Sequence, residues 1–185
     1  MNAGNTARRH LAARVYDAAH ITGTFTLRSG VVSNEYFDKY MFESDPRLLR
    51  EVAAACASLV PSDVDGLAGL ELGGVPLATM LSQILGMPTL FVRKQAKTYG
   101  TCRLAEGGEV EGRRLCVVED VVTSGGAILD AARELRGAGG VLGPVVCVID
   151  RESGGVEKLA AENLELRPLF TMTELKASGE PSLHT

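Results

Sequence analysis

Apolar residues follow two alternating patterns along the chain: short continuous runs and the spacing of an amphipathic helix. Runs rich in branched residues predict buried strands at residues 66–70, 89–93, 115–118, 141–150 and 166–171. Helical spacing predicts helices at residues 6–20, 45–59, 75–85, 127–136 and 155–162. Two further extended segments are expected at residues 24–27 and 35–37. Repeated strand–helix units of this size indicate an α/β protein with a central, mainly parallel sheet flanked by helices.

Local signals support two of these helices, and one stretch breaks the alternation. Asp45 and Pro46 suit the N-cap and first turn of the second helix, and Gly86 suits the end of the third. Residues 94–112 are polar, charged and glycine-bearing with no clear period, so we expect a mobile loop there. No repeat or linker divides the 185 residues, which predicts a single domain over residues 1–185.

Composition narrows the class of protein. Hydrophobic residues make up 45% and charged residues 23%, as in a soluble globular protein. The net charge of −4 gives no electrostatic case for nucleic acid, and no apolar run reaches membrane-spanning length, so we expect neither partner. The four cysteines lack metal-ligand spacing, which favours a reducing, cytoplasmic location. The scattered His10, His20 and His184 are expected to be solvated or capping residues.

The most informative segment is residues 117–127, Val-Val-Glu-Asp-Val-Val-Thr-Ser-Gly-Gly-Ala. Glu119 and Asp120 stand at the end of the predicted strand, where we expect them to be exposed to a ligand. The following hydroxyls and glycines lead into a helix N-terminus, whose N–H groups and dipole attract a phosphate. Carboxylates accept hydrogen bonds from sugar hydroxyls. The segment therefore predicts a site for a phosphorylated sugar, and the alternative is an ordinary strand-to-helix turn.

Two other segments offer groups for anions. Gly73 and Gly74 lie between a predicted strand and helix, as a second anion-accepting turn. Arg93, Lys94 and Lys97 begin the aperiodic loop, where they form either a solvated charge run or a cationic lid that closes over a leaving group. The nucleotide-binding pattern Gly-x-x-x-x-Gly-Lys-Ser/Thr does not occur in the sequence.

Candidate groups for a planar or anionic ligand lie elsewhere. Arg28 precedes the aromatic pair Tyr36 and Phe37, and Arg151 follows the predicted strand at residues 141–150. The arginines could instead be surface residues and the aromatics simple core. The end of a strand is where sites of α/β proteins lie, which favours a functional role for Arg151.

In this order and spacing, the segments between about residues 22 and 155 resemble the orotate phosphoribosyltransferases, which have the type I phosphoribosyltransferase fold. The resemblance implies a small N-terminal hood at about residues 1–40 and a mobile catalytic loop at about residues 94–112. It implies transfer of the 5-phosphoribosyl group from phosphoribosyl diphosphate (PRPP) to orotate, giving orotidine 5′-monophosphate and diphosphate in pyrimidine biosynthesis. It also implies Mg²⁺ held mainly through PRPP, with no direct protein ligand, and a homodimer with shared active sites.

The resemblance also implies residue roles. Catalytic roles fall on Lys97, Glu119 and Asp120. PRPP would be bound by Gly73, Gly74, Arg93, Lys94, Lys97, Tyr99, Glu119, Asp120, Val121, Val122, Thr123, Ser124, Gly125, Gly126 and Ala127. Orotate would be bound by Arg28, Tyr36, Phe37, Thr123 and Arg151.

The chain departs from the family pattern at two places. Many members carry histidine where Tyr99 stands, and some carry Tyr-Lys where this chain has Leu72 and Gly73. The tyrosine hydroxyl can donate a hydrogen bond, but unlike a histidine ring it cannot carry an additional proton at neutral pH. These departures leave open a phosphoribosyltransferase for another base. A second alternative is a PRPP-binding regulatory protein, which would keep the signature without a catalytic loop and would normally add a DNA-binding segment that the sequence does not show.

Overall fold

The computed structural model describes residues 3–26, 30–94 and 104–179. Its centre is a sheet of six strands in the order β5-β4-β3-β6-β7-β8. The strands are β3 (Gly66–Leu70), β4 (Thr89–Val92), β5 (Ala105–Glu106), β6 (Arg114–Val122), β7 (Val141–Asp150) and β8 (Leu166–Thr171). All neighbours are parallel except β4 and β5. The predicted α/β class and mainly parallel sheet are confirmed.

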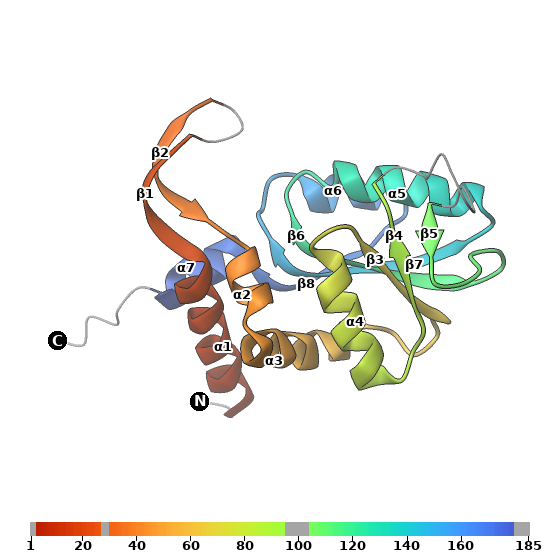
Figure 1. Cartoon of the computed structure of the whole chain (residues 1–185), viewed down its shortest axis with the longest axis horizontal. Helices are drawn as coiled ribbons and strands as arrows, with labels where there is room; N and C mark the ends of the chain where they lie inside the picture. Colours follow the sequence, from red (N-terminus) through yellow and green to blue (C-terminus); the bar gives the residue numbers. More distant parts are fainter. Residues whose placement is uncertain (1–2, 27–29, 95–103, 180–185) are drawn as a thin grey trace.

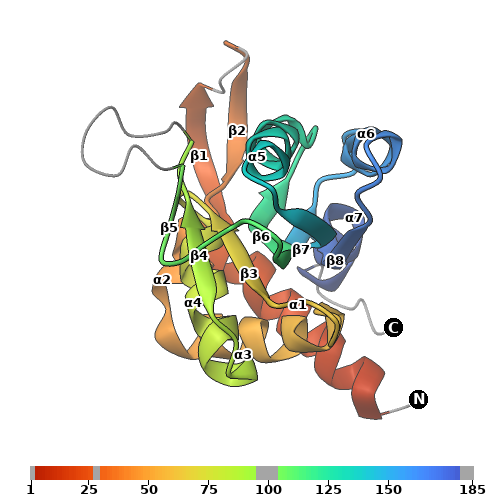
Figure 2. The same ribbon diagram turned by 90° about the vertical axis from the view of Figure 1, so that its right-hand side faces the viewer.

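Helices cover both faces of this sheet. On one face lie α5 (Gly126–Gly137) and α6 (Gly155–Ala161), and on the other lie α3 (Pro46–Cys56) and α4 (Gly74–Leu85) (Figures 1 and 2). Side chains of β6 alternate between two cores, because successive residues of a strand point to opposite faces. Cys116 and Val118 belong to the core under α3 and α4, whereas Leu115 and Val117 belong to the core under α5.

The N-terminal segment forms a small unit beside the sheet. It consists of α1 (Ala3–Ala19) and an antiparallel pair, β1 (His20–Thr26) and β2 (Val32–Phe37). In Figure 1 the β1–β2 pair projects away from the body of the molecule. The described residues of the segment expected to form a hood, about residues 1–40, thus fold as a helix and a two-stranded ribbon.

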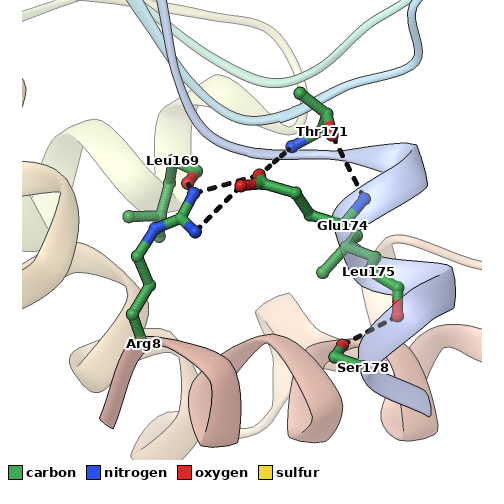
Figure 3. A network of polar contacts seen from close by, with 6 residues as sticks. All are labelled: Arg8, Leu169, Thr171, Glu174, Leu175 and Ser178. Carbon is green, nitrogen blue, oxygen red and sulfur yellow. Dashed lines mark hydrogen bonds and ion pairs between the residues drawn. The ribbon is translucent and has the colours of Figure 1, made fainter. Parts of the chain in front are cut away.

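A polar network joins α1 to the end of the chain (Figure 3). The Arg8 guanidinium donates to both carboxylate oxygens of Glu174 at 2.9 and 3.0 Å and to the Leu169 carbonyl at 2.7 Å. It also lies 5.0 Å from the centre of the Phe170 ring. Glu174 belongs to α7 (Met172–Gly179), so this arginine fixes α1 against the last strand and the last helix.

Helix boundaries follow the expected local chemistry. The Asp45 carboxylate accepts from the backbone N–H groups of Arg47 and Leu48, which confirms the cap predicted for α3. Helix α4 ends at Gly86, whose φ of 66° is the left-handed conformation that glycine adopts without steric cost. No helix in the described part of the chain is long and apolar enough to cross a membrane.

Four sequence predictions need correction. Strand β6 continues past residue 118 to Val122, so Glu119 and Asp120 lie within it. The predicted helix at residues 45–59 ends at Cys56 and continues as a short 3-10 turn, Ala57–Leu59. Residues 94–112 contain β5, which pairs with β4. The short helices α2 (Tyr40–Ser44) and α7 were not predicted, since five and eight residues carry too little periodicity.

Candidate active site

An open cavity of about 1080 Å³ lies between the β1–β2 pair, the ends of β6 and β7, and the beginning of α5. Its walls also include residues of α1 and α7. The lining residues are Tyr16, His20, Thr26, Ser33, Glu35, Tyr36, Phe37, Glu119, Val121, Val122, Thr123, Ser124, Gly125, Gly126, Ala127, Ile128, Arg151, Ser153, Met172 and Lys176. The cavity thus lies at the carboxyl ends of parallel strands, where α/β proteins bind ligands.

The turn from β6 to α5 forms one wall. Gly125 has a φ of 74°, and a Cβ at this position would approach the Leu159 side chain to 3.2 Å, so both conformation and space favour glycine. Thr123 and Ser124 are exposed within the cavity wall. The first N–H groups of α5 have no acceptors within the helix, and its first turn contains no acidic residue. This wall therefore offers hydroxyl and N–H donors to an anion.

Glu119 and Asp120 have different surroundings, although their side chains hydrogen-bond each other. Glu119 lines the cavity, whereas Asp120 lies against the Gly73 turn that precedes α4. Their exposed fractions are 9% and 1%, so the expectation that both carboxylates are exposed to a ligand is wrong. The reason is that β6 runs through both positions, which places both carboxyls within the sheet and not in a loop after it.

Asp120 is enclosed by partners from three parts of the chain. The Lys39 ammonium lies 2.6 Å from Asp120 Oδ2, and the Val121 N–H donates to Oδ1 at 2.5 Å. The buried carboxyl of Glu43, in α2, also hydrogen-bonds Asp120. On the remaining side, a Cβ at Gly73 would overlap Asp120 Oδ2, so this approach requires glycine. Lys39 and Glu43 were missed by the sequence analysis, because no local pattern signals a contact some 80 positions away.

Burial and hydrogen bonding shift the pKa values of these carboxyl groups in different directions. Burial, together with the hydrogen bond and charge of Asp120, raises the pKa of Glu43 to about 9. Burial and the neighbouring Asp120 also raise the pKa of Glu119 well above its usual range. Burial opposes ionisation of Asp120 as well, but hydrogen bonds from Glu119, Glu43 and Lys39 outweigh it and lower its pKa. Asp120 is therefore the member of the group that favours the charged form, and the two glutamates favour the neutral form.

The turn before α4 connects this cluster to the beginning of the predicted loop. A Cβ at Gly74 would overlap the Val118 carbonyl, so the turn is packed directly against β6. The Lys94 N–H donates to Glu71 Oε1 at 2.6 Å, which ties the loop to the same turn. The Arg93 guanidinium lies 3.4 Å from Glu106 Oε1 of β5. Arg93 is thus directed along the sheet edge.

The other end of the cavity is lined by aromatic and charged residues. Tyr36 and Phe37 come from β2, and Arg151 follows β7, with its N–H donating to the Val122 carbonyl at 2.9 Å. His20 also lies here, stacked 4.8 Å from the Tyr16 ring and hydrogen-bonded to Glu35 at 2.9 Å. The expectation that His20 is merely solvated or capping is therefore wrong.

The structure brings most of the predicted site residues together. The cavity wall contains Tyr36, Phe37, Glu119, residues 121–127 and Arg151. Among the described residues, Asp120, Gly73, Gly74, Arg93 and Lys94 lie outside this wall. Arg28, Lys97 and Tyr99 lie outside the described residues. Sequence analysis missed Tyr16, His20, Glu35 and Lys176, whose spacing matches no motif and whose proximity depends on the packing of α1, β1, β2 and α7.

The site suits a metal ion that is carried by a substrate. Within the described ranges, no three His, Cys, Asp or Glu side chains are arranged to hold a metal ion. The cavity wall nevertheless offers hard oxygen donors, namely the Glu119 carboxyl and the hydroxyls of Thr123 and Ser124. Mg²⁺ commonly takes one or two protein carboxylates and completes its shell with substrate phosphates and water.

Known proteins share both the sequence and the fold. The phosphoribosyl transferase domain family matches residues 41–163. An orotate phosphoribosyltransferase of Nocardioides sp. is 55% identical over 170 residues, which cover 92% of this chain and 95% of that protein. One from Methanocella arvoryzae is 45% identical over 153 residues, covering 83% and 87%.

A solved structure agrees. The crystal structure of Mycobacterium tuberculosis H37Rv orotate phosphoribosyltransferase in complex with PRPP has a TM-score of 0.79 and 30% identity, covering 92% of this chain and 99% of that one. The fold and the family match first define a phosphoribosyltransferase of type I. The chain belongs, more narrowly, to the orotate phosphoribosyltransferase family.

Proposed function

We propose that the cavity beside the β6–α5 turn binds PRPP and orotate together and is the site of phosphoribosyl transfer. The chain is an orotate phosphoribosyltransferase-type enzyme, which transfers the 5-phosphoribosyl group of PRPP to orotate and releases diphosphate. The observation that carries the assignment of the site is the meeting of Glu119, the hydroxyl- and glycine-rich turn, and Arg151 in one cavity at the strand ends.

The 5′-phosphate of PRPP binds at the β6–α5 turn in this proposal. Residues 121–127 supply backbone N–H groups, and Thr123 and Ser124 supply hydroxyl donors. Glu119 accepts hydrogen bonds from the ribose hydroxyls, and a cationic ribose in the transition state favours its ionised form. Burial and the neighbouring Asp120 raise the pKa of Glu119, and the positive charge that develops on the ribose in the transition state opposes this shift.

Asp120 acts from beside Glu119, outside the cavity wall. Its charge is fixed by Lys39 and lies next to Glu119 in sequence, so it contributes a negative field beneath the ribose. Diphosphate leaves toward the Gly73-Gly74 turn and the cations that begin the loop, Arg93 and Lys94. We include Lys97 and Tyr99 among the residues proposed to bind the diphosphate, as the family resemblance implies.

Orotate is held at the aromatic end of the cavity. Tyr36 and Phe37 offer flat apolar surface to the pyrimidine ring, and Arg151 offers a cation to its carboxylate. Arg28 and Thr123 are the further orotate contacts that the resemblance implies. A site with a donor reserved for the carboxylate rejects bases that lack one, because that donor is then left unpaired.

Mg²⁺, a homodimer and a cytoplasmic location complete the proposal. When bound, Mg²⁺ would neutralise charge on the diphosphate; it would be held mainly through PRPP, with the carboxyls at the site acting only indirectly. Exposed apolar side chains at Tyr40, Met41 and Leu72 flank residues that enclose Asp120 and offer a surface for a second subunit. The free, buried thiols of Cys56, Cys116 and Cys147 support a reducing compartment.

The test is a spectrophotometric assay of the purified enzyme with PRPP, Mg²⁺ and a panel of orotate, uracil, adenine and hypoxanthine. We expect turnover of orotate and little of the other bases. Arg151→Ala should lower kcat/KM for orotate on the order of a hundredfold, while PRPP affinity measured by calorimetry stays nearly constant. Faster turnover of adenine or hypoxanthine than of orotate would contradict the proposed base pocket.

A further inference from the structure

Lys39 connects the N-terminal unit to the strand that carries the site acids. It lies between the end of β2 and the start of α2, where the backbone is held on both sides. The Asp38 N–H donates to the Ala19 carbonyl at 2.8 Å, and the Asp38 carboxylate accepts from the Tyr40 N–H at 3.1 Å. From this anchored position, the Lys39 side chain reaches Asp120 at 2.6 Å.

The contact has little room to change. Asp120 is 1% exposed, and the approach of the Gly73-Gly74 turn leaves no space for a Cβ at Gly73. The Lys39 side chain is one-third exposed, so its ammonium keeps part of its hydration while it compensates a buried charge. A buried carboxylate without such a partner is costly and tends to take up a proton.

The titratable groups around Asp120 explain why the Lys39 ammonium is important. The groups that face it are Lys39, Glu43 of α2, Glu119 of its own strand and Cys147 of β7, with Asp38 and Tyr40 beside Lys39 and Glu43. Three carboxyl groups therefore compete for protons around one ammonium. The hydrogen bond and charge of Asp120, with the charge of Glu119, raise the pKa of Lys39 in spite of burial, so the lysine stays charged.

We propose that Lys39 is a positioning residue for phosphoribosyl transfer, whose ammonium fixes Asp120 as an ionised carboxylate between β6 and the Gly73-Gly74 turn. This inference rests on the function proposed above. By holding Asp120 ionised and in place, Lys39 fixes the charge that lies directly beside Glu119 in β6. The side chain acts through Asp120 and does not itself line the cavity.

The experiment compares the pH dependence of kcat/KM for PRPP in Lys39→Met, Lys39→Arg and Lys158→Met. Lys158 is an exposed lysine of α6 that does not line the cavity and serves as the matched control. Removing an opposite charge at this distance moves a carboxyl pKa by at least about one unit. We therefore expect the acidic limb of Lys39→Met to move to higher pH by about one unit or more, with about tenfold lower kcat/KM on that limb.

The controls separate charge from packing. The acidic limb of the kcat/KM profile should lie at the wild-type pH in Lys39→Arg, and it should also be unchanged in Lys158→Met. An unmoved limb in a folded Lys39→Met protein overturns the proposal, as does an equal displacement in Lys39→Arg. A lack of orotate turnover by the wild-type enzyme would instead count against the proposed function.

A second measurement applies even if Lys39→Met folds poorly. Chemical denaturation of Lys39→Met, Asp120→Asn and the double variant forms a cycle for the pair. We expect the double variant to be more stable than Lys39→Met alone, because it no longer buries an unpaired carboxylate. A double variant that is equally or less stable shows that Lys39 does not act through Asp120.

Discussion

The pKa of Glu43 provides the most direct test of how the carboxyl groups around Asp120 are protonated. Its carboxyl is 8% exposed, and burial beside Asp120 raises its pKa from 4.5 to about 9. The folded protein therefore keeps this proton at pH values where the unfolded chain has lost it. The unfolded state binds fewer protons in this range, so the free energy of unfolding decreases as pH rises.

The magnitude follows from linkage. Between the unfolded pKa of 4.5 and the folded value of about 9, this group lowers the free energy of unfolding by about 1.4 kcal/mol per pH unit. Glu43→Gln replaces the neutral acid by a neutral group of the same shape that still donates a hydrogen bond to Asp120. Relative to this variant, the wild type should lose about 4 kcal/mol between pH 5 and pH 8.

The assay is urea denaturation of both proteins at pH 5, 6, 7 and 8, at one protein concentration so that any association affects both alike. The difference between the two unfolding free energies isolates Glu43, because all other titrating groups are common to both. Parallel pH dependences would refute the reasoning, since they would mean that Glu43 is ionised in the folded state.

Two further substitutions test the neighbourhood of the two acids. Gly73→Ala would force a Cβ into Asp120 and should cost about 1–3 kcal/mol of stability by denaturation, whereas Gly137→Ala, with open space around it, should cost almost nothing. Glu119→Gln mimics the protonated acid, so it should leave the melting temperature unchanged but lower kcat on the order of a hundredfold in the orotate assay. Equal stability losses in the two alanine variants, or near-normal turnover with Gln at position 119, would contradict these expectations.

The strands and their order along the chain were predictable because the inner strands are buried on both faces. Residues 66–70 and 141–150 are mainly apolar, and the structure places β3 and β7 at those residues. The edge strand β8 also lies at the predicted residues 166–171, although it is less buried. Strand β6 was predicted too short because two acids interrupt its apolar run. Their place in a strand depends on partners such as Lys39 and Glu43, which no window of neighbouring residues reveals.

The cavity was predictable only in part for the same reason. The β6–α5 turn carries its chemistry in consecutive residues, so Thr123 to Ala127 were identified from order alone. Tyr16, His20 and Lys176 come from three separate elements. They meet because α1 packs on α7, a contact fixed in part by the long-range pair of Arg8 and Glu174.

The two adjacent acids of β6 have different roles in the proposed site. Both carboxyls are buried and hydrogen-bond each other, but only Glu119 lines the cavity. Asp120 contacts Lys39 and lies against Gly73. Glu119 is therefore the acid placed to contact the ribose, while Asp120 supplies a charge beside it that Lys39 compensates. The same pair of residues is thereby both a ligand-binding group and the point where the N-terminal unit is fixed to the sheet.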